Sequence, residues 1–290
     1  MTEKRIGLVL GSGGARGSAH VGVLKVLLDE GIVPDVVVGT SMGAEVGGAY
    51  AAGVSIERME EAWHSLNFGK VAKALLPTFP WSGWSSGRRM MRMIRELVGD
   101  VRIEDLPLPY AAVATDLETG LPYPIMQGDL ATAIRASESV PGLFSPVWID
   151  GHLLIDGGVS DPVPVDVARR LGADTVIAVD VLVRPEEVRL GGVTLPDLRE
   201  RFLGITKAIA REKARERFRP HVFAVLFQMS TIFQKRMSTI SLTAYPPDVL
   251  IQPDFSPDPP CYSDVKNGIE AGVIAARQAL PQIKRVIAEG

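Results

Sequence analysis

The sequence predicts an α/β protein built around a mainly parallel β-sheet. Short apolar runs alternate with helical patterns over the first part of the chain, and strand–helix–strand connections of this kind place successive strands parallel. A further apolar run, TVIAVDV at 175–181, follows a helical pattern at about 164–171. Neither an internal repeat nor a linker-like stretch interrupts the chain, so residues 1–290 are predicted to form a single domain.

The N-terminal part of the chain gives the clearest pattern. An apolar strand at 5–10 leads into the glycine-rich turn GSGGARG at 11–17, and a helix begins near Ser18. That helix is expected to stop at Gly31, because glycine commonly follows the last turn of a helix. The next strand, rich in valine, ends at GTSMG (39–43), after which alanines and glycines continue at helical spacing.

The segment after this second helix changes in character. Ser55 is predicted to cap a further helix, and 67–87 is rich in glycine, proline, serine and aromatic residues, which indicates irregular structure. A helix at 88–98 is basic and rich in methionine. The simpler interpretation is a surface helix whose methionines face the core. The alternative is a lid or a patch that contacts lipid.

The remainder of the chain continues the alternation of strands and helices. The predicted elements are two strands within 110–126, a helix at 131–140 ended by Pro141, a hairpin at 147–156 around Asp150-Gly151, long helices at about 196–217 and 221–242, a short strand at 249–252, and a C-terminal helix from Asp264.

Composition narrows the classes of function. The net charge of −3 provides no overall basic field, so a nucleic-acid partner is not predicted. Cys261 is the only cysteine and cannot form an internal disulfide, which fits a reducing compartment. The residues MTEK precede a short apolar run that does not resemble a signal peptide, and no apolar stretch reaches the ~18 residues of a membrane span. A cytoplasmic location is predicted, and peripheral contact with the inner membrane surface stays open.

The stretch GTSMG carries the first candidate for catalysis. A serine in a G-x-S-x-G turn between a strand and a helix stands in strained backbone geometry with its hydroxyl exposed. Gly39 and Gly43, two residues before and after Ser41, allow neighbouring segments to pass without clashes with a Cβ atom. The positive end of the helix dipole lies beneath the hydroxyl. We therefore predict that Ser41 is a nucleophile.

A serine nucleophile needs a base, and the histidines are poor candidates. None of the four histidines lies on a short loop after a late core strand, where the base of familiar serine hydrolases stands; they are His20, His64, His152 and His221. Asp156 ends an apolar hairpin strand and precedes two glycines, which would let its carboxylate approach another segment. The plainer interpretation is a D-G turn. Because a free aspartate has a pKa of about 3.9, a catalytic role requires a dry site that raises it.

The glycine-rich turn at 11–17 is the candidate oxyanion site. It joins a strand to a helix, so consecutive backbone N–H groups can converge on one anion. Dinucleotide binding fits poorly, because with Gly11 and Gly13 as the first glycines of G-x-G-x-x-G the last position is Arg16. The turn also lacks the glycine-lysine-serine/threonine ending of a P-loop.

Four blocks in this order carry a resemblance to a known family. They are GSGGARG at 11–17, GTSMG at 39–43, ASESVPGLFSP at 136–146 and DGG at 156–158. Together they resemble the patatin-like phospholipase family, and are most similar to its small bacterial members and to the catalytic domain of neuropathy target esterase. The resemblance covers about residues 5–183.

The resemblance implies a three-layer α/β/α fold and a hydrolase that cleaves acyl esters of lipids through an acyl-enzyme. By position, Ser41 is the nucleophile and Asp156 the general base of a Ser–Asp dyad. The backbone amides of Gly13, Gly14 and Ala15 would form the oxyanion hole, although Ser12 stands where plant members have a further glycine. The residues predicted to support the site are Arg16, Gly39, Gly43 and Gly157.

Other consequences of the resemblance concern the substrate and the alternatives. The third block, at 136–146, is expected to pack near the site without taking part in the chemistry. The segments at about 67–100 and 184–245 lack matching blocks and are expected to determine the lipid or ester substrate. No cofactor and no metal are called for, and the oligomeric state is left open. The competing hypothesis is a regulatory or protein-interaction module with the same fold and little catalysis.

Overall fold

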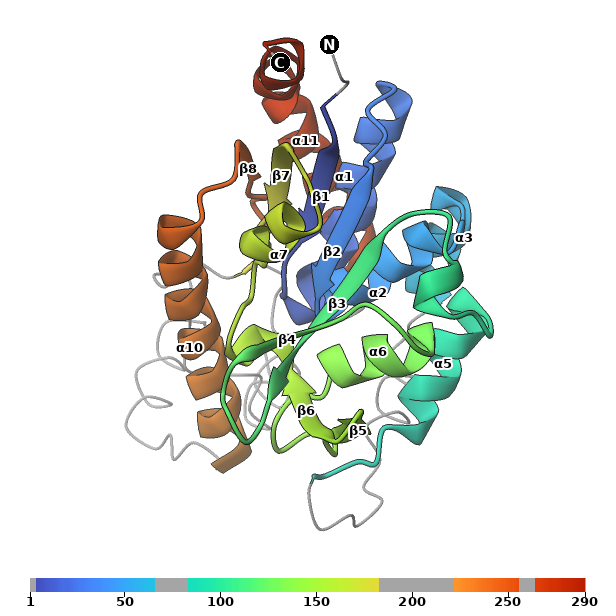
Figure 1. Ribbon diagram of the computed structural model, residues 1–290, viewed down its shortest axis with the longest axis vertical. Helices are drawn as coiled ribbons and strands as arrows, with labels where there is room; N and C mark the ends of the chain where they lie inside the picture. Colours follow the sequence, from blue (N-terminus) through green and yellow to red (C-terminus); the bar gives the residue numbers. More distant parts are fainter. Residues whose placement is uncertain (1–3, 66–82, 183–221, 256–263, 290) are drawn as a thin grey trace, which may run out of the picture.

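A computed structural model describes residues 4–65, 83–182, 222–255 and 264–289 (Figure 1). Its centre is an eight-stranded sheet with the strand order β5-β6-β3-β2-β1-β7-β8, in which β4 pairs with β3 outside this path. The strands are β1 (Ile6–Leu10), β2 (Val36–Thr40), β3 (Tyr110–Asp116), β4 (Pro122–Ile125), β5 (Val147–Ile149), β6 (His152–Asp156), β7 (Thr175–Val179) and β8 (Val249–Ile251).

The sheet is parallel in its centre and antiparallel at one side. Strand β1 pairs in parallel with β2 and β7, β2 pairs in parallel with β3, and β7 with β8. Strands β4 and β6 pair with β3 in antiparallel orientation, and β5 and β6 form a hairpin. The mainly parallel sheet predicted from the sequence is therefore confirmed.

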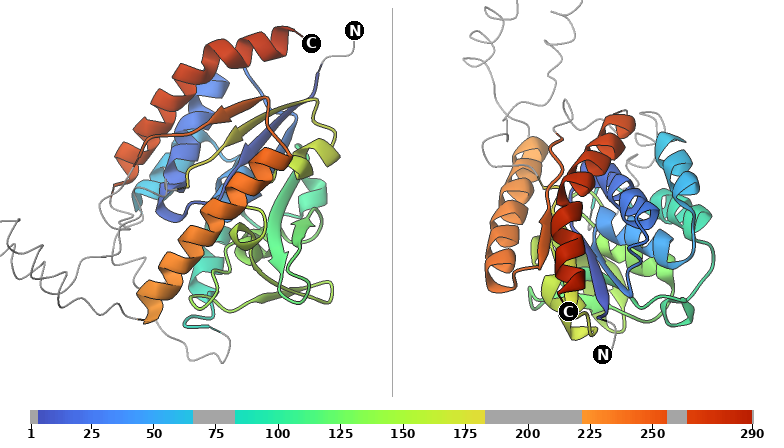
Figure 2. Two further views of the ribbon diagram at one scale, coloured as in Figure 1. Left: turned by 90° about the vertical axis from the view of Figure 1, so that its left-hand side faces the viewer. Right: turned by 90° about the horizontal axis from the view of Figure 1, so that it is seen from above.

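Helices cover both faces of this sheet, which gives the three layers that the resemblance implied (Figure 2). The helices are α1 (Ser18–Asp29), α2 (Met42–Ala51), α3 (Ile56–Ser65), α5 (Arg88–Val98), α6 (Leu130–Ser137), α7 (Val165–Arg170), α10 (Val222–Ala244) and α11 (Val265–Ala288), with short 3-10 turns η1 (Gly14–Gly17), η2 (Ile103–Asp105) and η3 (Gly157–Val159). The predicted helix at 131–140 ends earlier, at Ser137, and the carbonyl of Ser139 then accepts from the backbone N–H of Asp156 in β6.

The core lies on both faces because alternate strand residues point in opposite directions. On β1, Leu8 and Leu10 belong to the larger apolar cluster, which the side chains of α1, α2, α6 and α11 complete. Val9 belongs to the smaller cluster, which α7 and Leu242 of α10 complete. All three side chains are fully buried.

The first and last helices pack closely together. A Cβ atom at Gly22 of α1 would lie 2.0 Å from the carbonyl oxygen of Ile269 on α11, and one at Gly272 of α11 would lie 2.0 Å from that of Ala19. The two backbones therefore touch at these two glycines. Helix α11 is consequently an integral part of the larger apolar cluster, on the same face of the sheet as α1.

Two of the variable segments can be compared with their predictions only in part. Helix α5 agrees with the predicted helix at 88–98, and Met90 and Met91 pack against the core, in line with the simpler interpretation. The irregular segment at 67–87 lies mostly outside the described residues, as does the predicted helix at 196–217.

Candidate active site

Ser41 occupies the sharp turn between β2 and α2. Its backbone has φ 54° and ψ −124°, outside the regions that L-residues ordinarily adopt. Such strain is typical of a serine held on a strand-to-helix elbow. Helix α2 begins at the next residue, Met42, so the positive end of its dipole lies at Ser41.

The glycines of the elbow stand where backbones touch. A Cβ atom at Gly43 would lie 2.0 Å from the carbonyl oxygen of Leu10, and one at Gly39 would lie 2.2 Å from that of Gly43. No side chain fits at either position without moving the backbone. The predicted steric role of Gly39 and Gly43 thus has a direct structural basis, since the elbow packs against the end of β1.

Strand β3 brings Ser41 and Asp156 together. Strand β4 pairs with one edge of β3, and β2 and β6 share the other edge. Strand β2 ends at Thr40 opposite Val113, and β6 ends at Asp156 opposite Ala114, the next residue of β3. The ends of β2 and β6 therefore meet.

The two side chains are in hydrogen-bond contact. The Ser41 hydroxyl donates to Oδ2 of Asp156 at 2.8 Å, and the backbone N–H of Gly158 donates to Oδ1 at 2.7 Å. Ser41 is 5% exposed and Asp156 is 1% exposed. Burial raises the pKa of Asp156 to about 6, against the opposite effect of these two hydrogen bonds. The dry site that the sequence argument required is present.

Gly157 lets this carboxylate approach the elbow. A Cβ atom at Gly157 would lie 2.0 Å from the carbonyl oxygen of Val113 and 2.9 Å from Cγ2 of Thr40. The glycine after Asp156 therefore permits the crossing of three chain segments at one point.

Residues at the C-terminal end of α6 hold both members of the pair, which the sequence analysis missed. The backbone N–H of Ser41 donates to Oγ of Ser137 at 2.8 Å, and that hydroxyl donates to the carbonyl oxygen of Val113 at 2.6 Å. The backbone N–H of Asp156 donates to the carbonyl oxygen of Ser139 at 3.0 Å. The third block, expected only to pack, thus links nucleophile and base. The only feature of the sequence that pointed to this role was that residues 136–146 form one of the four blocks of the resemblance.

Two carboxyl groups lie close to the elbow, of which Glu138 is buried and Glu45 is half-buried. Burial raises the pKa of Glu45, on the first turn of α2, to about 7. Burial also raises the pKa of Glu138 well above its usual range, and the negative charges of Glu45 and Asp156 add to this effect. Both effects favour the neutral form of Glu138, which limits the negative charge close to Asp156.

Backbone hydrogen bonds fix the start of the glycine-rich turn, and the backbone N–H groups that follow are the ones predicted to form the oxyanion hole. The backbone N–H of Gly11 donates to the carbonyl of Val179 at 2.9 Å, and that of Ser12 donates to the carbonyl of Pro162 at 2.8 Å. Gly14 and Ala15 open the 3-10 turn η1, where N–H groups lack partners within the helix. The amides predicted for the oxyanion hole are thus free of intrahelical hydrogen bonds.

The side chains of Arg16 and His20, in and after this turn, contact backbone carbonyl oxygens. Nε of Arg16 donates to the carbonyl oxygen of Phe255 at 3.1 Å, which ties the turn to the segment before α11. His20 is fully buried with Nε2 2.8 Å from the carbonyl oxygen of Gly11. Burial lowers the pKa of His20 to about 4, so its imidazole is neutral and donates this bond at pH 7.

The other histidines lie elsewhere. His64 is exposed on α3, His152 contacts Asp116 through Nδ1 at 2.5 Å, and His221 lies outside the described residues. Within the part of the chain that the structure describes, no imidazole is hydrogen-bonded to Ser41. The aspartate is the ionisable group at the serine.

Comparison with known proteins agrees with the family that the sequence resembles. The family model described as patatin-like phospholipase matches residues 8–169. A Mycobacterium tuberculosis protein, named as an uncharacterized NTE family protein, is 43% identical over 183 residues, which are 62% of this chain and 50% of that protein. The human patatin-like phospholipase domain-containing protein 6 is 40% identical over 186 residues, 62% of this chain and 14% of its own length.

A solved structure, that of VipD from Legionella pneumophila, aligns with a TM-score of 0.49 and 15% identity over 96% of this chain and 67% of that one. The matched region of the curated relatives spans half or less of their own length.

The chain belongs to the patatin-like phospholipase family. The resemblance that the four blocks carry is thereby confirmed.

Proposed function

We propose that the protein hydrolyses acyl esters of lipids through a Ser41–Asp156 dyad and an acyl-enzyme intermediate. The observation that carries the proposal is the 2.8 Å hydrogen bond from the Ser41 hydroxyl to the Asp156 carboxylate, made at a strained elbow and in a buried site. A hydroxyl that donates directly to a carboxylate of raised pKa is arranged for proton transfer to it.

In the acylation step, Asp156 accepts the hydroxyl proton as Oγ of Ser41 attacks the ester carbonyl carbon. The carbonyl oxygen becomes an oxyanion, for which the backbone N–H groups of Gly13, Gly14 and Ala15 are the donors. Collapse of this intermediate breaks the bond to the alcohol, and the proton held by Asp156 passes to the departing oxygen. The acyl group remains on Ser41.

In the deacylation step, a water molecule gives a proton to Asp156 and attacks the acyl carbon. The second oxyanion uses the same backbone donors. Its collapse breaks the bond to Oγ, which takes the proton back from Asp156, and a fatty acid is released. The dipole of α2 favours negative charge at its N-terminus throughout. Atoms and protons balance over the two steps, with water as the only co-substrate.

The first test is labelling of Ser41 by a fluorophosphonate probe. Wild-type protein is expected to be labelled, and Ser41→Ala to lose the label together with more than about 10³-fold of kcat/KM on a short-chain ester. The same pair of proteins is then assayed on phospholipids, lysophospholipids and acylglycerols to define the substrate. Folded wild-type protein that takes no label would instead favour the interaction module.

A second prediction concerns Ser137 as a positioning residue. Ser137→Ala leaves the buried N–H of Ser41 without its acceptor, at a cost of about 1–3 kcal/mol. We expect kcat on a soluble ester to fall about tenfold or more with little change in KM, because the elbow loses its support. The matched control is Ser139→Ala, which also removes a buried hydroxyl, here one bonded to Arg135, but keeps the backbone carbonyl that contacts Asp156. Equal losses in both variants would contradict this role, and Ser137→Thr should restore activity.

A further inference from the structure

Helix α10 is attached to the site region by its polar side. Four polar side chains of α10 make hydrogen bonds to residues in the loops that follow the strands. The contacts are Gln234 Oε1 with Ser12 Oγ at 3.2 Å, Lys235 Nζ with Asp180 Oδ2 at 3.0 Å, Ser238 Oγ with Asp180 Oδ2 at 3.3 Å, and Ser241 Oγ with Asp161 Oδ1 at 2.9 Å. The first of them joins the helix directly to the turn that carries the predicted oxyanion hole. The helix therefore has a fixed orientation relative to the site.

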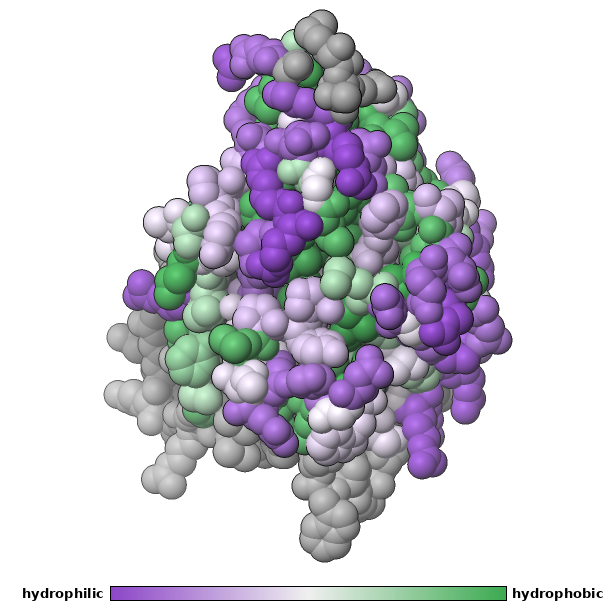
Figure 3. Space-filling model, viewed as in Figure 1, coloured by the Kyte–Doolittle hydropathy of each residue, from purple (hydrophilic) through white to green (hydrophobic). Residues whose placement is uncertain are grey.

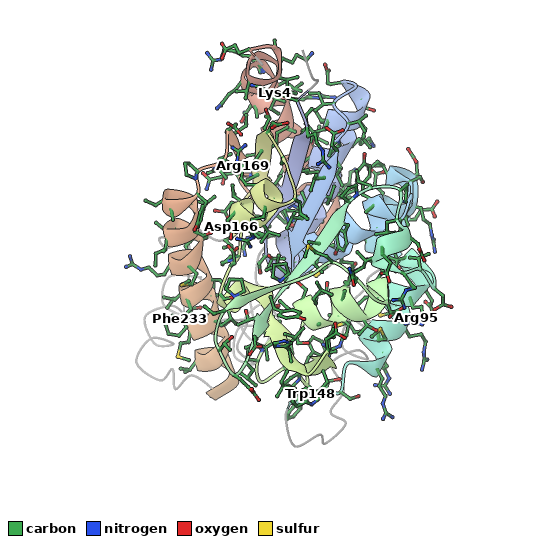
Figure 4. All side chains as sticks on the ribbon, in the orientation of Figure 1. Lys4, Arg95, Trp148, Asp166, Arg169 and Phe233 are labelled. Carbon is green, nitrogen blue, oxygen red and sulfur yellow. The ribbon has the colours of Figure 1, made fainter. Side chains whose placement is uncertain are left out.

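The opposite side of α10 is exposed and apolar. Five of its large hydrophobic side chains are between 43% and 60% exposed: Val225, Met229, Ile232, Phe233 and Ile240. At 3.6 residues per turn, they fall within a sector of about 100° along the length of the helix. Figure 4 shows Phe233 on the outer side of α10, and Figure 3 shows hydrophobic residues on the surface along its course.

This arrangement departs from the usual polarity of a surface helix, because α10 packs Leu242 against the core and exposes an apolar stripe as well. Helices on a globular protein bury their apolar side and expose their polar side. Single exposed hydrophobic residues are ordinary, but a continuous stripe of them marks a surface that contacts another apolar phase or partner. The inner hydrogen bonds hold the stripe outward, so rotation of α10 to bury it would break them.

The charges on α10 indicate what kind of surface its apolar stripe contacts. The helix contains no aspartate or glutamate, and its ionisable residues are Lys235 and Arg236. Lys235 is paired with Asp180 on the inner side. Arg236 lies in the middle of the exposed apolar stripe, between Phe233 and Ile240. An apolar face with a cation and no acid suits the interface of an anionic bilayer, where side chains enter the acyl boundary and cations meet lipid phosphates.

We propose that the outer face of α10 lies on the surface of an anionic lipid bilayer and holds the site next to its lipid substrate. The helix would lie in the interface, because no helix among the described residues is long and apolar enough to cross a membrane. The purpose of this contact rests on the proposed lipid hydrolysis, whereas the contact itself is a separate property of α10. The two can therefore be tested separately.

The test measures vesicle binding in a Ser41→Ala background, so that hydrolysis does not affect the result. Vesicles of equal parts phosphatidylglycerol and phosphatidylcholine are compared with pure phosphatidylcholine by co-sedimentation. We expect tighter binding to the anionic vesicles, and a loss of about tenfold or more in the partition coefficient when Phe233 and Ile240 are both changed to serine. Arg236→Glu should weaken binding to the anionic vesicles, whereas Arg236→Lys should preserve it.

The matched control is Ile274→Ser, which removes an exposed hydrophobic side chain, 52% exposed, from α11, whose buried side chains belong to the core on the other face of the sheet. This variant should bind as the parent does. With Ser41 intact, the α10 variants should hydrolyse a soluble short-chain ester at the wild-type rate. Unchanged vesicle binding of the double variant would overturn the proposal, as would a dimer in solution that the double variant dissociates. Vesicle binding without any ester hydrolysis would contradict the proposed function but would still support the proposal for α10.

Discussion

Asp156→Asn is expected to abolish ester hydrolysis while the protein remains folded. The amide keeps the size of the carboxyl group and can still accept the N–H of Gly158, but it cannot take a proton from Ser41. Since no imidazole is bonded to Ser41 in the described part of the chain, we expect kcat/KM on a soluble ester to fall by about 10³-fold or more. Near-ultraviolet circular dichroism should match that of the wild type.

The matched control for this variant is Asp161→Asn. Asp161 is another buried aspartate of the same region, 4% exposed, but it bonds Ser241 of α10 and not Ser41. It should retain most of the activity. If Asp156→Asn stays active and a histidine variant does not, the dyad is wrong.

The same carboxylate gives the expected pH dependence. A base must be ionised to act, so kcat/KM should rise about tenfold per pH unit below the folded pKa of about 6 and level off above it. Because Glu45 has a pKa of about 7 and lies behind the elbow, the profile should also be measured in Glu45→Gln, where the midpoint should persist.

Linkage gives the sign of the matching effect on stability. The raised pKa means that the folded state binds the Asp156 proton more tightly than the unfolded state, so this contribution to the free energy of unfolding is present at low pH and is lost as pH rises through about 6. Asp156→Asn should therefore gain stability relative to the wild type as pH rises from 4 to 7, as thermal melts would record.

Gly43→Ala is expected to destabilise the fold and disrupt the site together. The new methyl group would lie 2.0 Å from the carbonyl oxygen of Leu10, and neither backbone can move without displacing β1 or the elbow. We expect the free energy of unfolding to fall by about 3 kcal/mol or more and fluorophosphonate labelling to be lost. Urea unfolding provides the measurement.

The matched control is Gly47→Ala on the same helix. A Cβ atom there would lie 2.8 Å from a side-chain methyl of Val37, which can shift more readily than a backbone carbonyl. Alanine also has the higher helix propensity, so we expect a loss of about 1 kcal/mol or less. A Gly43→Ala protein as stable as this control would contradict the close approach of elbow and β1.

The local parts of the site could be predicted because their signals are local. The strand, the glycines and the helix around Ser41 lie within one short stretch, and so do the turn at 11–17 and the hairpin that ends at Asp156. Spacing and the steric needs of glycine were enough to identify each of them. The sheet was equally accessible, since buried valine-rich strands alternate with helices.

The parts that depend on long-range pairing could not be predicted from residue patterns. Ser41 meets Asp156 because β2 and β6 follow one another along a single edge of β3, and nothing in the three strands specifies this register. The contact of Ser137 with the elbow arises in the same way. The outward direction of the apolar stripe of α10 emerges only when the polar partners of the helix, Ser12 and Asp180, are known.

The close seam between α1 and α11 affects the order in which the chain can acquire its native packing. The backbone of α1 at Gly22 is covered by Ile269, which lies about 250 positions later in the chain. During synthesis, the strands and elbow emerge well before the helix that covers them. The face of α1 that α11 covers therefore stays exposed to solvent until residues 264–289 have left the ribosome.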